Sequence, residues 1–176
     1  MKLSQIGTFF TVLFILSCGS KQTTGSLDIT AEKSAVNKTM DQWHKAAANA
    51  DFTDYFNRMT KDAIFIGTDA TENWSNTEFR AFSKPYFDRG KAWYFTPLER
   101  HIYFSDKSDL AWFDELLDTQ MGVCRGSGVL KKQDGQWKIV HYVLSMTIPN
   151  NQVKSVVSQK RISDSLLIKK IKVSEN

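Results

Sequence analysis

Apolar residues recur at intervals of three or four along the first half of the chain, a spacing that is typical of amphipathic helices. This pattern predicts a helix over residues 31–50, with Thr30 as its N-cap. A short second helix is predicted over residues 52–59, and Asp51 can cap it. The apolar positions that define the first helix are Ala35, Val36, Met40, Trp43, Ala46, Ala47 and Ala50.

A third helix is predicted over residues 76–90, where aromatic residues again follow the helical spacing. Asn76 can cap this helix and Gly90 can end it. Pro85 lies inside the segment, and proline removes a backbone donor and crowds the preceding turn. We therefore expect a kink or an interruption at Pro85.

Strand-like segments surround and follow the third helix. Residues 62–67 form a short apolar run, and turn residues then lead to Trp74, which suggests a hairpin. Asp134-Gly135 stands between two alternating segments and is a strong hairpin signal. Short connections join the last four strands, so we expect an antiparallel meander. These four strands are predicted over residues 92–105, 110–119, 121–132 and 136–149.

The order of these elements predicts an α+β fold in a single domain over residues 30–150. Three helices in the N-terminal half must cover one face of one curved sheet. A sheet covered in this way forms a cone, and the interior of such a cone is a usual place for a small ligand. We therefore expect a hollow between the sheet and the helices.

The start of the chain has the features of an export signal. A basic start and an apolar run over residues 6–16 describe a secretory signal peptide, because a bilayer span needs about 20 apolar residues. The residues "ILSC" resemble a bacterial lipobox, in which the cysteine carries the lipid. We expect a signal peptide over residues 1–17, lipidation at Cys18 and a flexible linker over residues 18–29. The protein would then be an exported lipoprotein, anchored to a membrane of the bacterial cell envelope on the periplasmic or outer-membrane side.

The alternative is an ordinary exported protein that discards Cys18 with its leader. Cys124 is the other cysteine of the chain. If Cys18 carries lipid, Cys124 has no partner for an intramolecular disulfide. The hydrophobic core alone must then stabilise the fold, although disulfides are common in an oxidising compartment. Cys124 is therefore predicted to be a small buried apolar residue.

The formal net charge of +4 is a property of the C-terminal tail. Residues 152–176 contain six Lys/Arg and two Asp/Glu, which gives +4, whereas residues 30–151 contain 15 and 16 and are near neutral. A nucleic-acid-binding domain would carry its basic residues as a patch on the folded body. Nucleic acid is therefore not an expected partner, and residues 151–176 are predicted to be a basic amphipathic tail outside the domain.

Residues 126–145, "GSGVLKKQDGQWKIVHYVLS", resemble the closing hairpin of the SnoaL-like branch of the nuclear-transport-factor-2-like superfamily. There, Asp-Gly leads into Trp-x-Ile-x-His-x-His-x-Ser, and here Val143 replaces the second histidine. The resemblance covers residues 31–150 and implies a cone-like antiparallel sheet with three helices. It also implies a homodimer, because relatives often dimerise through the sheet. The superfamily contains isomerases, cyclases, hydrolases and assembly domains, so the fold alone does not give a function.

Two adjacent carboxylates, Asp114 and Glu115, lie among apolar residues of a predicted strand. Side chains of a strand alternate between its faces, so one carboxylate must face the interior, and the sequence does not say which. A buried carboxylate has a raised pKa and can act as a general acid or base. The alternative is a carboxylate paired with a neighbouring Arg or His, and Arg125 on the next strand could supply that partner.

His141 shares one face of its strand with Trp137, Ile139, Val143 and Ser145, and we expect this mostly apolar face to look inward. His141 is then either an acid/base group that titrates near neutral pH or a hydrogen-bonded core residue. Ser145 lies in the middle of a strand, where no nucleophile elbow can form.

Trp74 and Trp112 are candidates to line an aromatic pocket, because tryptophan tends to occupy partly wet surfaces. Ordinary core packing is the equal alternative. The histidines and cysteines lack the spacing of metal ligands, so we expect no metal and no cofactor.

Together these features favour a module that binds a small, largely apolar molecule in the cone, without catalysis. The first alternative is an acid/base enzyme of the isomerase, cyclase or hydrolase type that uses Asp114 or Glu115 with His141. The second alternative is a dimeric assembly or interaction module. The residues expected at the ligand site are Trp74, Trp112, Asp114, Glu115, Arg125, His141 and Ser145.

Overall fold

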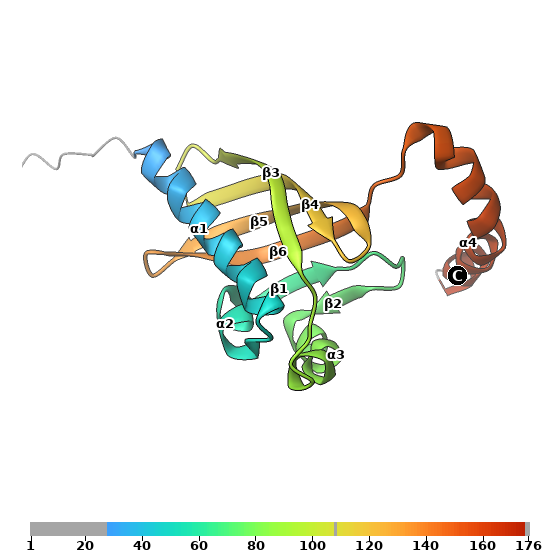
Figure 1. Cartoon of the computed structure of the whole chain (residues 1–176), viewed down its shortest axis with the longest axis horizontal. Helices are drawn as coiled ribbons and strands as arrows, with labels where there is room; N and C mark the ends of the chain where they lie inside the picture. The colour runs from blue at the N-terminus through green and yellow to red at the C-terminus, as the bar shows by residue number, and fades with distance from the viewer. Residues whose placement is uncertain (1–27, 108, 175–176) are drawn as a thin grey trace, which may run out of the picture.

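The computed structural model describes residues 28–107 and 109–174 (Figure 1). The predicted signal peptide, Cys18 and most of the predicted linker lie outside these residues. The helices are α1 (Ile29–Ala48), α2 (Phe52–Asn57), α3 (Asn76–Asp88), the short 3₁₀ helix η1 (Asn150–Gln152) and α4 (Val153–Ser174). The strands are β1 (Met59–Ile66), β2 (Asn73–Ser75), β3 (Phe95–Phe104), β4 (Leu110–Thr119), β5 (Gly122–Gln133) and β6 (Gln136–Met146).

The six strands form one curved, unclosed sheet in the order β2-β1-β6-β5-β4-β3. Strands β3 to β6 form the predicted antiparallel meander. Strand β1 pairs in parallel with β6, which departs from the all-antiparallel sheet that we expected. Helix α1 lies across the sheet and α2 and α3 lie at one end of it, as Figure 1 shows. The predicted α+β class, with its helices in the N-terminal half, is confirmed.

Two helix starts differ from the prediction because other side chains cap them. Asp28 accepts hydrogen bonds from the backbone of Thr30 and Ala31, so α1 begins before the expected cap. Ser75 forms a capping box with Glu78 at the start of α3. Asp28 and Ser75 therefore cap these two helices, in place of the expected Thr30 and Asn76.

We expected a kink or an interruption at Pro85. Helix α3 continues through Pro85 to Asp88, so an interruption is excluded. Its buried face carries Phe79 and Ser83 before the proline and Phe87 after it. Because both halves of the helix pack into the same core, tertiary contacts hold the segment together across the missing backbone donor.

A β-bulge in β6 changes which residues face the interior. Leu130 pairs with Ile139 while its neighbour Val129 pairs with His141, so Val140 is an extra residue on β6. One extra residue moves every later side chain to the opposite face. Tyr142 consequently faces the core and is fully buried. The expectation that His141 faces the interior is wrong for this reason.

Aromatic rings fill most of the space between the sheet and the helices. Trp43 of α1 stacks on Tyr55 of α2 with ring centroids 4.8 Å apart. Phe65 of β1 stacks on Phe79 of α3 at 4.0 Å. Cys124 is fully buried among apolar residues, as predicted. The hollow that we expected between the sheet and the helices is therefore partly filled by these rings.

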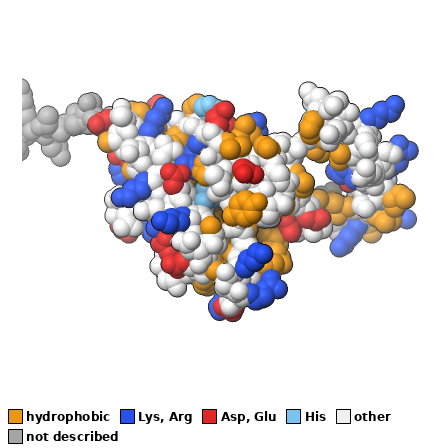
Figure 2. Space-filling model, in the orientation of Figure 1, with side chains coloured by type: hydrophobic (Ala, Val, Ile, Leu, Met, Phe, Trp, Pro, Cys, Tyr) orange, Lys and Arg blue, Asp and Glu red, His pale blue; other side chains and the backbone are white. Residues whose placement is uncertain are grey.

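Helix α4 continues the chain beyond the sheet and extends away from it (Figure 1). None of its residues is buried, and Lys and Arg side chains stand out along it (Figure 2). No helix in residues 28–107 and 109–174 is both long enough and apolar enough to span a membrane.

Candidate functional site

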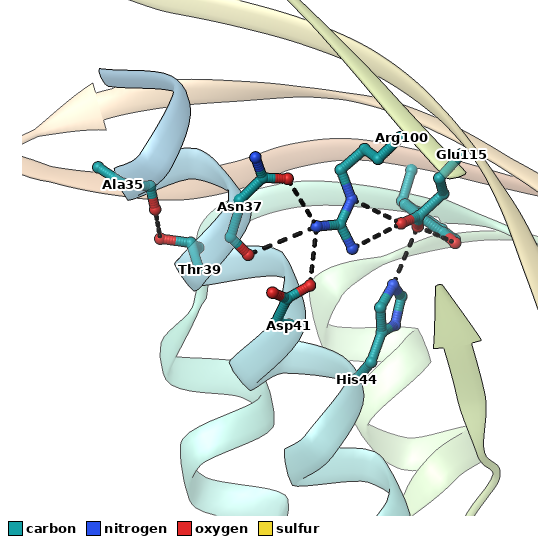
Figure 3. A network of polar contacts seen from close by, with 8 residues as sticks. Ala35, Asn37, Thr39, Asp41, His44, Arg100 and Glu115 are labelled. Carbon is teal, nitrogen blue, oxygen red and sulfur yellow. Dashed lines mark hydrogen bonds and ion pairs between the residues drawn. The ribbon is translucent and has the colours of Figure 1, made fainter. Parts of the chain in front are cut away.

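Glu115 is the inward-facing member of the acidic pair, and it lies at the centre of a buried polar network (Figure 3). Its Oε1 lies 2.9 Å from Nε2 of His44 and accepts a hydrogen bond of 3.0 Å from the hydroxyl of Tyr142. His44 is 3 % exposed, and Glu115 and Tyr142 are fully buried. The predicted pairing of the inward carboxylate with a basic side chain is therefore present, and it also includes a phenol.

Arg100 of β3 holds the other carboxylate oxygen of Glu115. Its Nε donates a hydrogen bond of 2.8 Å to Oε2, and its Nη2 lies 2.8 Å from the carboxylate outside hydrogen-bonding angles. On the opposite side, Nη1 donates to Oδ1 of Asn37 at 3.0 Å and to Oδ1 of Asp41 at 2.8 Å. The guanidinium group thus joins the buried Glu115 to the more exposed Asp41 on α1 (Figure 3).

Simple periodicity places these side chains together. Asn37, Asp41 and His44 are four and three residues apart, so they lie on one face of α1. Arg100 and Glu115 are direct partners across β3 and β4 and therefore point to the same face of the sheet.

A glycine makes room for the network on β5. A Cβ atom at Gly126 would lie 2.3 Å from the Tyr142 hydroxyl and 3.0 Å from Oε1 of Glu115. The backbone must therefore approach closely at this position, which only glycine allows.

The network keeps Glu115 ionised. Burial alone would raise the pKa of this carboxyl, but the hydrogen bond and charge of His44, together with Arg100, outweigh burial and lower the pKa below 4.5. The pKa of Tyr142 is raised well above 10, first by burial and then by the neighbouring carboxylate. The cluster is thus an ionised carboxylate held by neutral and cationic donors, the opposite of the raised-pKa acid that a general acid requires.

Asp114 faces the outer side of the sheet. Its Oδ1 lies 3.3 Å from Nδ1 of His101 and 3.7 Å from Nη1 of Arg125, and its side chain is 36 % exposed. Arg125 is therefore the partner of the outward carboxylate and not of the inward one. Trp112 lies on the same outer face, where it is 47 % exposed and stacks on Tyr103 at 6.0 Å.

His141 and Ser145 also lie on this outer face. They pair directly with Val129 and Arg125 of β5, whose side chains point outward. Glu115 and His141 therefore lie on opposite faces of the sheet, and the structure does not bring them together. Of the residues expected at a ligand site, only Glu115 and Trp74 lie on the inner side.

An apolar pocket remains at one end of the cone, between α3, the β1–β2 turn and the β4–β5 turn. Its volume is about 170 Å³. Phe95 lines the pocket, and its ring packs edge-on against His44 at 5.7 Å, so this ring separates the pocket from the buried network. The other aromatic residues that line the pocket are Phe65, Trp74, Phe79, Phe82 and Trp93.

A hollow of about 790 Å³ lies between the β1–β2 turn, the end of β6 and α4, and its lining mixes apolar side chains such as Ile148 and Leu167 with charged ones such as Asp69 and Lys160. Two other hollows, with volumes of about 530 and 620 Å³, lie beside the β5–β6 turn and are less suited to an apolar molecule. Charged and amide side chains such as Lys61, Asp62, Lys38 and Gln42 line them. Within residues 28–107 and 109–174, no group of three or more His, Cys, Asp or Glu side chains could hold a metal ion.

Sequence reasoning missed three members of the buried network, namely His44, Arg100 and Tyr142. The helical spacing of the predicted first helix already placed His44 next to the core residue Trp43. Arg100 would have followed from the register of β3 and β4. Tyr142 could be found only by locating the bulge in β6, for which the sequence carries no clear signal.

The chain belongs to the SnoaL-like domain family, whose model matches residues 36–149, well over half of the chain. No curated protein matches the sequence. The fold and the resemblance at the closing hairpin thus agree on the family, while its members differ in function.

Solved structures share the fold at low sequence identity. An NTF2-like protein of unknown function from Pseudomonas putida is 15 % identical, with a TM-score of 0.59 over 70 % of this chain and 92 % of that chain. A putative dehydratase of the NTF2-like family from Streptomyces avermitilis is 12 % identical, with a TM-score of 0.60 over 68 % and 99 %. A putative ketosteroid isomerase from Shewanella frigidimarina is 22 % identical, with a TM-score of 0.54 over 65 % and 97 %. At these identities the likeness establishes the fold alone.

Proposed function

We propose that this protein is a binding module that holds a small, largely apolar molecule in the aromatic pocket at the end of the cone. The observation that carries the proposal is the pocket of about 170 Å³ lined by six aromatic side chains. A cavity of about 150 Å³ lined by apolar side chains is large enough to bind benzene. A molecule with one ring, or with an apolar headgroup of that size, therefore fits.

Binding is favoured over acid/base catalysis by the positions of the ionisable groups. Asp114 and His141 face the outer side of the sheet. Glu115 is fully buried and its two oxygens already accept three hydrogen bonds. An acid/base enzyme needs a proton-transferring group within reach of its substrate, and Phe95 stands between the pocket and this carboxylate's partner His44.

Titration with benzene and phenol, followed by the indole N–H signals of Trp74 and Trp93 in nuclear magnetic resonance spectra, tests the proposal. Both signals should shift and saturate. Met121→Trp, which fills the pocket, should abolish the shifts, whereas Met146→Trp, at a residue 53 % exposed outside the pocket, should leave them unchanged. Absence of saturable shifts in the unaltered protein would rule out this pocket as a binding site.

We further propose that the protein is exported and anchored to the cell envelope by lipid on Cys18. The support is the apolar run followed by "ILSC" at the start of the chain. Mass spectrometry of the protein from its native membrane should show an N-terminal lipid-modified Cys18. An unmodified N-terminus downstream of this residue would contradict the anchor.

The outer face of the sheet is the surface that we propose for a homodimer. Trp112 and Tyr103 are each 47 % exposed there and stack on one another. The pair Asp114 and Arg125 lies beside them, so two copies related by a two-fold axis could exchange ionic contacts. Sedimentation should show a dimer that Trp112→Asp converts to a monomer, and a monomer at all concentrations of the unaltered protein would exclude it.

A further inference from the structure

We propose that the aromatic pocket selects a small organic cation, such as a trimethylammonium or other alkylammonium headgroup, over a neutral molecule of the same shape. This inference rests on the proposed function and names the chemical class of its ligand. It is carried by Glu72, an acidic residue that lines a pocket consisting mainly of aromatic rings.

The charge of the pocket is set by a single residue. Of the twelve described residues that line it, Glu72 is the one with an ionisable side chain, and Thr68 and Gln120 are the neutral polar ones. No Lys, Arg or His among the described residues lines the pocket. An anionic ligand would therefore meet an uncompensated negative charge, whereas a cation would meet a counter-ion.

The turn between β1 and β2 holds the carboxylate of Glu72 in place. The backbone N–H of Gly67 donates to the carbonyl oxygen of Glu72 at 2.9 Å, and the N–H of Glu72 donates to the carbonyl oxygen of Asp69 at 3.0 Å. Oε2 of Glu72 then accepts a hydrogen bond from the backbone of Asp69 at 3.1 Å. A Cβ atom at Gly67 would lie 2.1 Å from this oxygen, so the carboxylate occupies the space that glycine leaves open.

Glu72 has no cationic partner in the described part of the chain. None of the ion pairs within residues 28–107 and 109–174 includes it. Its Oε1 accepts no side-chain hydrogen bond from these residues, while Oε2 is held by the turn. A half-buried carboxylate with one free oxygen beside apolar rings is an arrangement that a bound cation would complete.

The aromatic rings favour the same kind of ligand. The face of an aromatic ring is negative and attracts a cation within about 6 Å, tryptophan most strongly. Trp74 stacks on Phe82 at 4.3 Å, and Phe79 and Trp93 stack at 5.9 Å, so two tryptophans and two phenylalanines gather at the pocket. The cation–π contacts within residues 28–107 and 109–174 go to other rings, so the protein itself does not supply the cation here.

Choline and its neutral isostere 3,3-dimethyl-1-butanol test the inference directly, because they differ in the charge of one central atom and share their shape. The isostere keeps every apolar contact and lacks the ion pair and the cation–π attraction. We expect the unaltered protein to bind choline at least about tenfold more tightly than the isostere. The affinities can be measured from the indole N–H signals of Trp74 and Trp93.

Two variants of the turn and one matched control locate the charge effect. Glu72→Gln keeps the shape and the hydrogen bond from Asp69 but removes the charge, and should weaken choline about tenfold while leaving the isostere unchanged. Gly67→Ala keeps the charge but forces the carboxylate out of its place, and should weaken choline in the same way. Glu99→Gln removes a carboxylate that is 56 % exposed on β3 and does not line the pocket, and should change neither affinity.

The outcomes separate this inference from the proposed function. Equal affinity for choline and the isostere, or a Glu72→Gln variant that still prefers choline, would refute the preference for a cation and leave the apolar binding site in place. The same conclusion would follow if the protein binds benzene and phenol but does not bind choline. If none of these probes binds, both the inference and the proposed function fail.

Discussion

Asp114 and Glu115 are neighbours in the chain, yet the structure gives them opposite environments. Asp114 lies on the outer face of the sheet, 36 % exposed, with His101 and Arg125 at 3.3 and 3.7 Å. Glu115 lies on the inner face, fully buried, and accepts hydrogen bonds from Arg100, Tyr142 and His44, the last at 2.9 Å. Water can replace the partners of the first residue and not those of the second, so the same chemical group should contribute very different amounts to stability.

The largest difference is expected when the charge of each residue is removed. Glu115→Gln removes the buried anionic partner of Arg100 and leaves it only the more exposed Asp41, so it should lower the free energy of unfolding by about 3 kcal/mol. Asp114→Asn should lower it by less than about 1 kcal/mol, because its ion pairs are solvent-exposed. Urea unfolding of the three proteins measures both values. Equal losses for the two variants would show that burial does not distinguish these residues.

A smaller effect is expected from two tyrosines on the two faces of the sheet. Tyr142→Phe removes a buried hydrogen bond to the Glu115 carboxylate and should lower the free energy of unfolding by about 2 kcal/mol. Tyr103→Phe removes a hydroxyl from a residue that is 47 % exposed and should change it by less than about 0.5 kcal/mol. Thermal unfolding followed by circular dichroism gives the comparison, and an equal shift for both variants would contradict it.

The smallest effect concerns the dependence of stability on pH. The pKa of Glu115 is below 4.5 in the folded protein because His44 and Arg100 outweigh the effect of burial. Below about pH 4.5 the unfolded chain therefore binds more protons than the folded one, and this part of the stability is lost as the pH falls further. The loss amounts to about 1.4 kcal/mol for each unit by which the two pKa values differ.

Several carboxylates contribute to acid unfolding, so the contribution of Glu115 must be measured by comparing variants with the unaltered protein. Glu32 also has a lowered pKa, first through its hydrogen bond with Lys132, and it should act in every variant. The slope of stability against pH between about pH 5 and pH 3 should be shallower in Glu115→Gln than in the unaltered protein. Asp114→Asn should keep the original slope, and an unchanged slope in Glu115→Gln would refute the lowered pKa.

Local patterns in the sequence predicted most of the fold. Helical spacing identified α1, α2 and α3, and alternation with short turns identified the meander of β3 to β6. These signals are local because each reflects which side of one element meets the core. Family membership followed from the closing hairpin, and the family model covers residues 36–149.

The candidate site was harder to predict, since its parts depend on register between distant segments. The sequence required one carboxylate of the pair to face inward and could not choose between them. The tertiary structure decides it, because Glu115 pairs with Arg100 across the strands and contacts His44 of α1. The bulge at Val140 then turned His141 outward and Tyr142 inward. Trp74, a predicted pocket residue, lies on the inner side, but the positions of its neighbours Glu72 and Trp93 depend on the folding of loops that periodicity does not describe.

The sequence by itself therefore determined the class of fold, the order of its elements and the alternation that separates Asp114 from Glu115. Tertiary structure decided which of the two is buried, which basic groups hold it, and where space remains for a ligand. The physical reason is that alternation is a property of a single strand, whereas burial and cavities depend on how strands, turns and helices from distant parts of the chain fit together.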